Sequence, residues 1–161
     1  ICFRVPGFNM TENHRTLALF YCRNVPGSSE ADRQAIEAAH GGAIRLFPLP
    51  CSGRLDSVHL MRALEAFADA AYLITCPEGT CRYFEGNVRA KARVERTRAL
   101  IESIGLEGER VGMVMESRDD PKPLAILARE IRERVFPLKP SPVLQGPTRS
   151  TEPAPGEEKR V

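Results

Sequence analysis

The sequence lacks long apolar segments and any strong excess of charge. No run approaches the ~20 apolar residues that a membrane-spanning helix needs, so we expect no membrane span. The net charge of +2 is too mild for the basic stripe typical of nucleic-acid-binding proteins. We therefore expect no nucleic-acid partner. No charged segment followed by an apolar one marks a secretion signal, so we expect a cytoplasmic protein. Because the chain begins at Ile1 rather than Met, we expect either a missing N-terminal stretch or an unusual start.

Signatures of nucleotide binding and of catalysis are absent as well. The sequence has no complete Gly-x-Gly-x-x-Gly or P-loop motif. None of His14, His40 and His59 is spaced as a catalytic base beside a serine or cysteine, and no pair of carboxylates suggests a hydrolase. We therefore expect no substrate chemistry from this chain alone.

The cysteine pattern excludes a secreted disulfide scaffold. There are five cysteines, an odd number, and no secretion signal accompanies them. Short Cys-x-x-Cys hairpins, which are usual in structural zinc sites, are also missing. The thiols are then buried apolar groups, metal ligands or redox-active groups.

Four short apolar runs alternate with helical segments along the chain. The runs cover residues 16–21, 43–49, 71–75 and 111–115. Helices are expected over 30–40, after Asp56 or Ser57, over 88–104 and over 123–135. This alternation predicts an α/β fold: a small four-stranded parallel sheet in the flavodoxin-like order 2-1-3-4, with helices on both faces.

Composition divides the chain into three parts. Residues 1–15 form an N-terminal arm, and residues 16–136 form the α/β domain. Six of the thirteen prolines follow Phe136, and few apolar residues accompany them, so residues 137–161 cannot form a core. This tail is either disordered or an extended arm that lies on a partner.

Three cysteines stand at the ends of the first three predicted strands. Cys22 and Cys76 directly follow a strand, and Cys51 lies two residues beyond one. The carboxyl ends of parallel strands share one edge of a sheet, so these residues are expected to meet there. Cys81 comes five residues after Cys76, in a loop that can fold back to the same place. Cys2 stands apart and is interpreted as a bystander or as part of an interface.

Four convergent thiolates suit either zinc or an iron–sulfur cluster, and the spacing alone does not choose between them. A zinc module that scaffolds a complex therefore remains an alternative. A thiol–disulfide protein that uses Cys76 and Cys81 as a reversible pair is another. In the remaining alternative the thiols merely pack in the core.

Two motifs give the chain a resemblance to a known family. They are Cys51-Ser52-Gly53-Arg54 and the stretch Cys76-Pro77-Glu78-Gly79-Thr80-Cys81-Arg82-Tyr83-Phe84-Glu85-Gly86-Asn87. Over about residues 16–136 the chain resembles the delta subunit of methyl-viologen-reducing hydrogenase. The resemblance implies one [2Fe–2S] cluster on Cys22, Cys51, Cys76 and Cys81. It also implies a non-catalytic subunit that relays electrons within a larger oxidoreductase complex.

The same resemblance suggests partners. One is a flavin- and iron–sulfur-containing subunit like that of heterodisulfide reductase; others are hydrogenase, formate dehydrogenase or acyl-CoA reductase modules. The chain departs from the family at Cys22-Arg23-Asn24-Val25, which keeps only the first cysteine of a Cys-x-x-Cys pair. Thr75 and Arg82 depart as well. With these departures the chain resembles a divergent branch of the family, which is found in the tungsten benzoyl-CoA reductase complexes of strict anaerobes.

Residues around the cysteine loop have two interpretations each. Gly79 and Gly86 either serve turns or let backbone amides approach the cluster sulfurs. Tyr83 is expected over the cluster or in the core, and Arg54 near the cluster or simply exposed. The basic residues of the segment 88–104 form either a docking face for an acidic partner or a solvated helix face.

Overall fold

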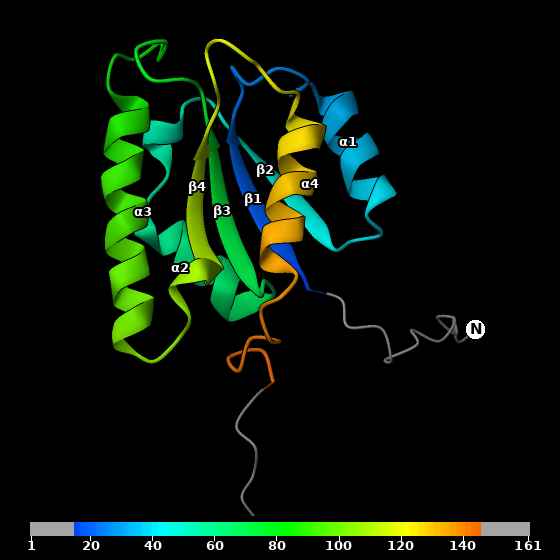
Figure 1. The fold of residues 1–161 in the computed structure, drawn as a ribbon, viewed down its shortest axis with the longest axis vertical. Helices are drawn as coiled ribbons and strands as arrows, with labels where there is room; N and C mark the ends of the chain where they lie inside the picture. The colour runs from blue at the N-terminus through cyan, green and yellow to red at the C-terminus, as the bar shows by residue number, and fades with distance from the viewer. Residues whose placement is uncertain (1–14, 146–161) are drawn as a thin grey trace, which may run out of the picture.

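A computed structural model describes residues 15–145, in which each of four parallel strands is followed by a helix (Figure 1). The strands are β1 (Leu17–Cys22), β2 (Ile44–Leu49), β3 (Ala70–Thr75) and β4 (Val111–Met115). The helices are α1 (Glu30–Ala39), α2 (Ser57–Ala66), α3 (Gly86–Ser103) and α4 (Leu124–Val135). Two short 3-10 helices, η1 (Ser52–Arg54) and η2 (Gly108–Arg110), complete the described chain.

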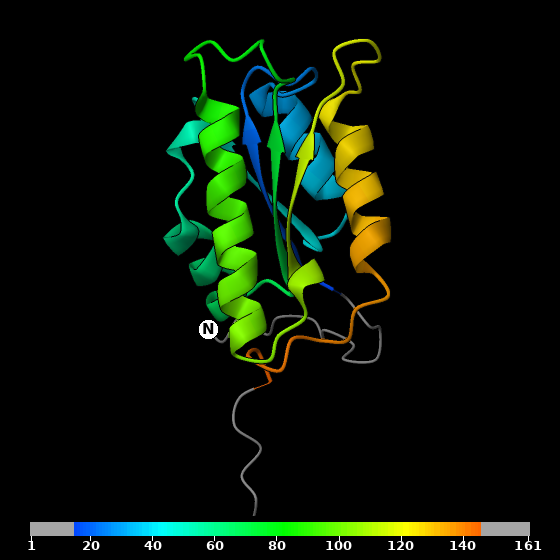
Figure 2. The same cartoon turned by 60° about the vertical axis from the view of Figure 1, so that its left-hand side comes forward.

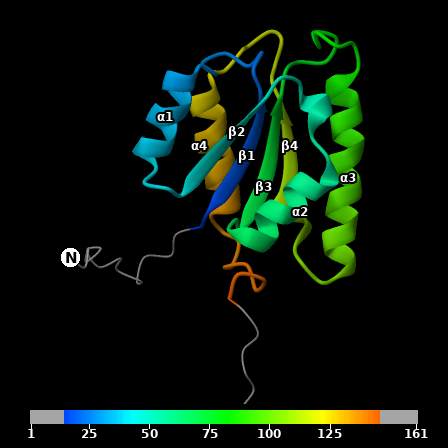
Figure 3. The ribbon, with the colours of Figure 1, turned by 180° about the vertical axis from the view of Figure 1, so that it is seen from behind.

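The sheet has the order β2-β1-β3-β4 with every pair parallel, which confirms the predicted fold class and strand order. Helices α1 and α4 cover one face, and α2 and α3 cover the other (Figures 1 and 3). Successive side chains of a strand point to opposite faces. Leu17 and Leu19 therefore pack under α1 and α4, whereas Ala18 and Phe20 pack under α2 and α3. Every residue of the central strands β1 and β3 is buried, as a two-sided cover requires.

The sequence supplies helix start signals that the structure uses. Ser29 caps α1 and accepts a hydrogen bond from the Asp32 N–H, and Asp56 caps α2 in the same manner. Pro123 precedes the first residue of α4, where its missing N–H costs nothing. The described helices show no span that combines the length and hydropathy needed to cross a membrane.

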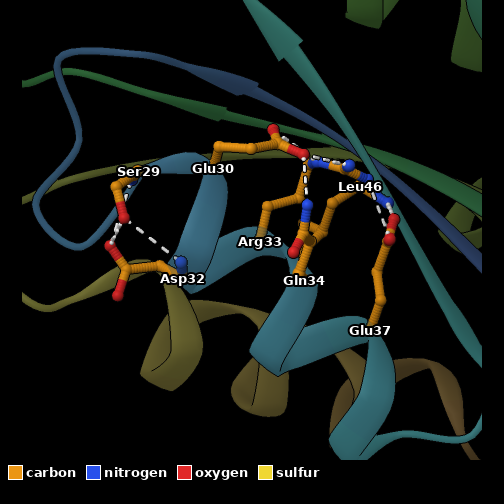
Figure 4. A network of polar contacts seen from close by, with 7 residues as sticks. All are labelled: Ser29, Glu30, Asp32, Arg33, Gln34, Glu37 and Leu46. Carbon is orange, nitrogen blue, oxygen red and sulfur yellow. Dashed lines mark hydrogen bonds and ion pairs between the residues drawn. The ribbon is translucent and has the colours of Figure 1, made fainter.

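Edge strand β2 is protected against pairing with another chain. Glu37 of α1 accepts a hydrogen bond from the Leu46 N–H at 2.8 Å, and Arg33 holds this carboxylate while it also pairs with Glu30 (Figure 4). Pro48, also in β2, has no N–H to offer. Both features reduce the unpaired donors of the edge.

The segment that follows α4 lies at the amino ends of the strands. Arg110, which is fully buried, donates to the carbonyls of Asp69 and Lys139 at 3.0 and 2.9 Å. The Ser141 N–H donates to the Asp69 carboxylate at 2.6 Å. Residues 137–145 of the predicted tail are thus held against the domain, at the end of the sheet opposite to the loops after β1, β3 and β4 (Figure 2). The N-terminal arm up to residue 14, with Cys2, and residues 146–161 lie outside the described part.

Candidate metal centre

The carboxyl edge of the sheet brings together the four cysteines singled out from the sequence. Cys22 is the last residue of β1, Cys51 directly precedes η1, and Cys76 directly follows β3. Cys81 lies in the loop between β3 and α3. The first three are buried and Cys81 is half-buried, and all four are free thiols.

The thiols lie in one contiguous group. The sulfur atoms of Cys51 and Cys81 are 3.9 Å apart, and the Cys76 thiol interacts with those of Cys22 and Cys81. Within residues 15–145, no three His, Cys, Asp or Glu side chains already stand in the geometry of a bound metal ion. The site is a cluster of soft sulfur donors at the carboxyl edge of the sheet.

Backbone N–H groups point at the sulfur of Cys81. Burial by itself raises the pKa of Cys81, but the N–H groups of Tyr83, Asn87 and Gly86 donate to the sulfur and hold the pKa below its ordinary value. Two of these donors belong to the first residues of α3, where the helix dipole also favours a negative charge. The loop thus stabilises a thiolate at Cys81.

Burial has the opposite effect on two other thiols. It raises the pKa of Cys76 to about 12, and the nearby Cys22 and Cys81 add to the shift. Burial also raises the pKa of Cys51, against the opposing effect of the Gly53 N–H, which lies 3.4 Å from its sulfur. Closely packed buried thiols ionise together only when a cation compensates them, and a metal centre supplies that charge.

Two glycines allow the Cys51 turn to approach the start of α3. A Cβ on Gly53 would stand 2.9 Å from the Cα of Gly86, and a Cβ on Gly86 would stand 2.4 Å from the Cys51 sulfur. Gly86 therefore serves the close approach to sulfur. Gly79, with φ of +74°, serves a turn instead.

Two side chains fix the cysteine loops and were not identified from the sequence. Arg93 of α3 donates to the carbonyls of Gly53 and Leu55, both at 2.7 Å. Asn87, which is fully buried, donates to the carbonyls of Pro77 and Cys76 at 3.0 and 3.3 Å. The only sequence signal was indirect: Asn87 ends the Gly-Asn motif, and Arg93 stands among the basic residues of the same helix.

An open hollow of about 400 Å³ adjoins the Cys51 side of the site. Its lining includes Cys51 and Gly86 together with Arg54, Tyr83 and Arg89. Tyr83 is 61% exposed, so it borders the hollow and is not a core residue. Cys51 is thus the thiol that faces this opening.

Comparisons with known proteins give the family. The sequence profile of the family described as methyl-viologen-reducing hydrogenase, delta subunit, matches residues 17–138. The vhu iron–sulfur subunit of the F420-non-reducing hydrogenase of Methanocaldococcus jannaschii is 31% identical over 100 residues, which cover 62% of this chain and 75% of that protein. The subunit of the same name from Methanopyrus kandleri is 26% identical over 129 residues, 80% of this chain and 98% of the relative.

A shorter similarity extends to a second kind of protein. One subunit of the ferredoxin:CoB-CoM heterodisulfide reductase of Methanosarcina mazei is 32% identical over 68 residues, which are 42% of this chain and 9% of that protein. The profile match covers every element from β1 to α4, including all four cysteines at the sheet edge. The chain therefore belongs to the family of the delta subunit of methyl-viologen-reducing hydrogenase.

Proposed function

We propose that this chain binds one [2Fe–2S] cluster through Cys22, Cys51, Cys76 and Cys81 and relays electrons within a larger oxidoreductase complex. One observation carries the proposal: three strand ends and one loop bring four thiols into a single group. The names of the relatives support it, because they are iron–sulfur subunits of hydrogenases.

The residues present fit such a cluster. Cysteine thiolates are its usual ligands, and hydrogen bonds to sulfur are one of the means by which a protein tunes its potential. The N–H groups of Tyr83, Gly86 and Asn87 around Cys81 are donors of this kind. When bound, the cluster would supply one-electron redox chemistry, while the chain supplies burial, positive charge and these donors.

The chain acts as a relay in this proposal, and other subunits carry the substrate chemistry. The similarity to part of a heterodisulfide reductase supports a flavin- and iron–sulfur-containing partner of that type. Hydrogenase, formate dehydrogenase or acyl-CoA reductase modules are the proposed electron donors or acceptors. The complex is proposed to be cytoplasmic and to work in an anaerobic cell.

Anaerobic purification of the full chain tests the cluster type. We expect about two irons and two acid-labile sulfides per chain, visible absorption, and a paramagnetic signal after reduction. A colourless protein with one zinc ion would favour the scaffold alternative. A metal-free protein in which thiol titration finds a reversible disulfide would favour the thiol–disulfide alternative.

Serine substitution tests the ligand set. Cys22→Ser, Cys51→Ser, Cys76→Ser and Cys81→Ser should each lower the iron content or change the spectrum, because a hydroxyl replaces a thiolate ligand. Cys2→Ser, outside the ligand set, is the matched control. Unchanged iron and an unchanged spectrum in Cys51→Ser would show that the ligand set is wrong.

A further inference from the structure

Phe84 stands at the tip of the cysteine loop in an unfavourable backbone conformation. Its φ is +64°, and it is the one residue other than glycine with positive φ among residues 15–145. Bulky residues rarely adopt this region, which glycine and asparagine tolerate. Two hydrogen bonds close this turn. The Phe84 N–H donates to the Cys81 carbonyl at 3.1 Å, and the Glu85 N–H donates to the Tyr83 carbonyl at 2.9 Å.

The turn needs a positive φ but not a phenyl ring. The ring of Phe84 is 90% exposed, so burial within this chain does not explain it. Tyr83 and Val88 beside it are 61% and 47% exposed. An exposed apolar group in a strained position, three residues after Cys81 and next to Tyr83 of the hollow, points to contact with another molecule.

Positive charge surrounds these apolar side chains. Arg54, Arg82 and Arg89 are all exposed, and Arg54 and Arg89 line the hollow next to Cys51. Arg89 forms a loose 3.5 Å pair with Glu85, whereas Arg54 and Arg82 have no carboxylate partner within residues 15–145. Even with the exposed Glu78 in the same loop, the surface keeps a positive excess.

The four thiols differ in their access to this surface. Cys22 and Cys76 are 1% and 2% exposed, whereas Cys51 borders the hollow and Cys81 is half-buried beneath the turn. A redox partner seated on the loop would approach the site from the side of Cys51 and Cys81.

We propose that Tyr83, Phe84, Arg54, Arg82 and Arg89 form a docking surface for a redox protein whose face has an acidic rim around an apolar recess. The phenyl ring of Phe84 inserts into the recess, and the arginines pair with the rim. One electron then passes between the partner's centre and this chain's centre, so that one is oxidised and the other reduced. This inference rests on the proposed electron-relay function.

Electron transfer from an acidic probe protein tests the surface. Reduced plant-type [2Fe–2S] ferredoxin is mixed with the oxidised, cluster-containing chain in a stopped-flow instrument, and the second-order rate constant is followed as salt is raised. The rate constant should fall with salt, because opposite charges steer the encounter. We expect Phe84→Gly to lower it about fivefold or more, and Arg54→Glu with Arg82→Glu about tenfold.

Phe84→Gly separates docking from structure. Glycine fits a positive φ, so the variant should keep its iron and unfold at the same or a higher temperature. Dithionite, which needs no docking surface, should reduce wild type and variants at equal rates. Phe136→Ser, which changes an exposed ring at the far end of α4, and Arg62→Glu on α2 are the matched controls and should leave the ferredoxin rate unchanged.

Each contrary result overturns the docking surface in a distinguishable way. Equal ferredoxin rates in wild type and Phe84→Gly would show that the ring contacts no partner. Loss of iron from Phe84→Gly would show that the ring serves the cluster. Binding to phosphatidylserine vesicles that needs Phe84, with unchanged ferredoxin rates, would assign the surface to a membrane. Wild type without iron would contradict the proposed function itself.

Discussion

Gly86, the first residue of α3, lies against the sulfur of Cys51. A Cβ at position 86 would stand 2.4 Å from that sulfur and 3.0 Å from the sulfur of Cys81. Both distances are shorter than van der Waals contact, so only a residue without a side chain lets the helix start where it does. The N–H of Gly86 can then point at Cys81, as the pKa of that thiol reflects.

Gly86→Ala should therefore damage the site more than the fold. The added methyl group must push Cys51 or Cys81 away from its place in the thiol group, because the Cβ would stand too close to both sulfur atoms. We expect the iron content after anaerobic purification to fall to less than about half of that of wild type, with a loss of about 1–3 kcal/mol in the free energy of unfolding.

Gly41→Ala is the control for a general loss of stability. Gly41 has a φ of +54° with open space around its Cβ position, and it precedes β2 whereas Cys51 follows that strand, so alanine strains the backbone without touching the site. The variant should lose about 1 kcal/mol of stability and keep its iron. Equal iron loss in both glycine variants would contradict the steric argument.

Arg93→Ala should loosen the turn that carries Cys51. The guanidinium donates to the carbonyls of Gly53 and Leu55, and hydrogen bonds from a charged donor contribute about 1.5–3 kcal/mol each. We expect a loss of about 2–4 kcal/mol in the free energy of unfolding and faster removal of iron by a chelator. Arg96→Ala, which changes an exposed residue of the same helix, should do neither. A similar rate of iron removal in both variants would contradict the role of Arg93 in holding this turn.

Local sequence signals predicted the parallel sheet and its order because the chain alternates between apolar runs and helical segments. The strand Val111–Met115 is found at its predicted bounds, and β1 begins and ends one residue later than predicted, so that Cys22 is its last residue. The neighbourhood of the four thiols then followed from topology alone, since parallel strands end at one edge. Their role as ligands stays a prediction.

Contacts between distant segments were not predictable in the same manner. The basic residues of α3 were interpreted as a face for solvent or for a partner, yet Arg93 and Arg98 donate to carbonyls of their own chain. Likewise, the composition of the tail gave no sign that Ser141 would bind Asp69. Such pairs depend on which surfaces meet after folding, and residue type and spacing do not encode this.

Asn87→Asp tests the hydrogen bonds that hold the Cys76 end of the loop. The substitution keeps the shape of the side chain but replaces the amide donor with oxygen, which then faces the carbonyls of Cys76 and Pro77 in a buried position. We expect a loss of about 2–4 kcal/mol in the free energy of unfolding, because a buried donor is lost and a charge is added. Asn24→Asp, at an exposed position of another loop, is the control. Urea unfolding curves that shift equally for both variants would contradict this role.

Glu107→Gln should reveal a pH-dependent ion pair at the opposite end of the sheet. Arg110, bonded to Glu107 at 2.7 Å, holds the pKa of that carboxyl below its ordinary value of 4.5. The pair therefore stabilises the fold above pH 4.5, and this stabilisation is lost as the pH falls through the lowered pKa. Because the Glu107 side chain is 42% exposed, we expect the variant to lose only about 1–2 kcal/mol near neutral pH, less than a fully buried pair would cost. Urea unfolding at neutral and at strongly acidic pH should show that the difference in unfolding free energy between wild type and the variant shrinks in acid. A difference that stays constant would contradict a stabilising role for the charge of Glu107 beside Arg110.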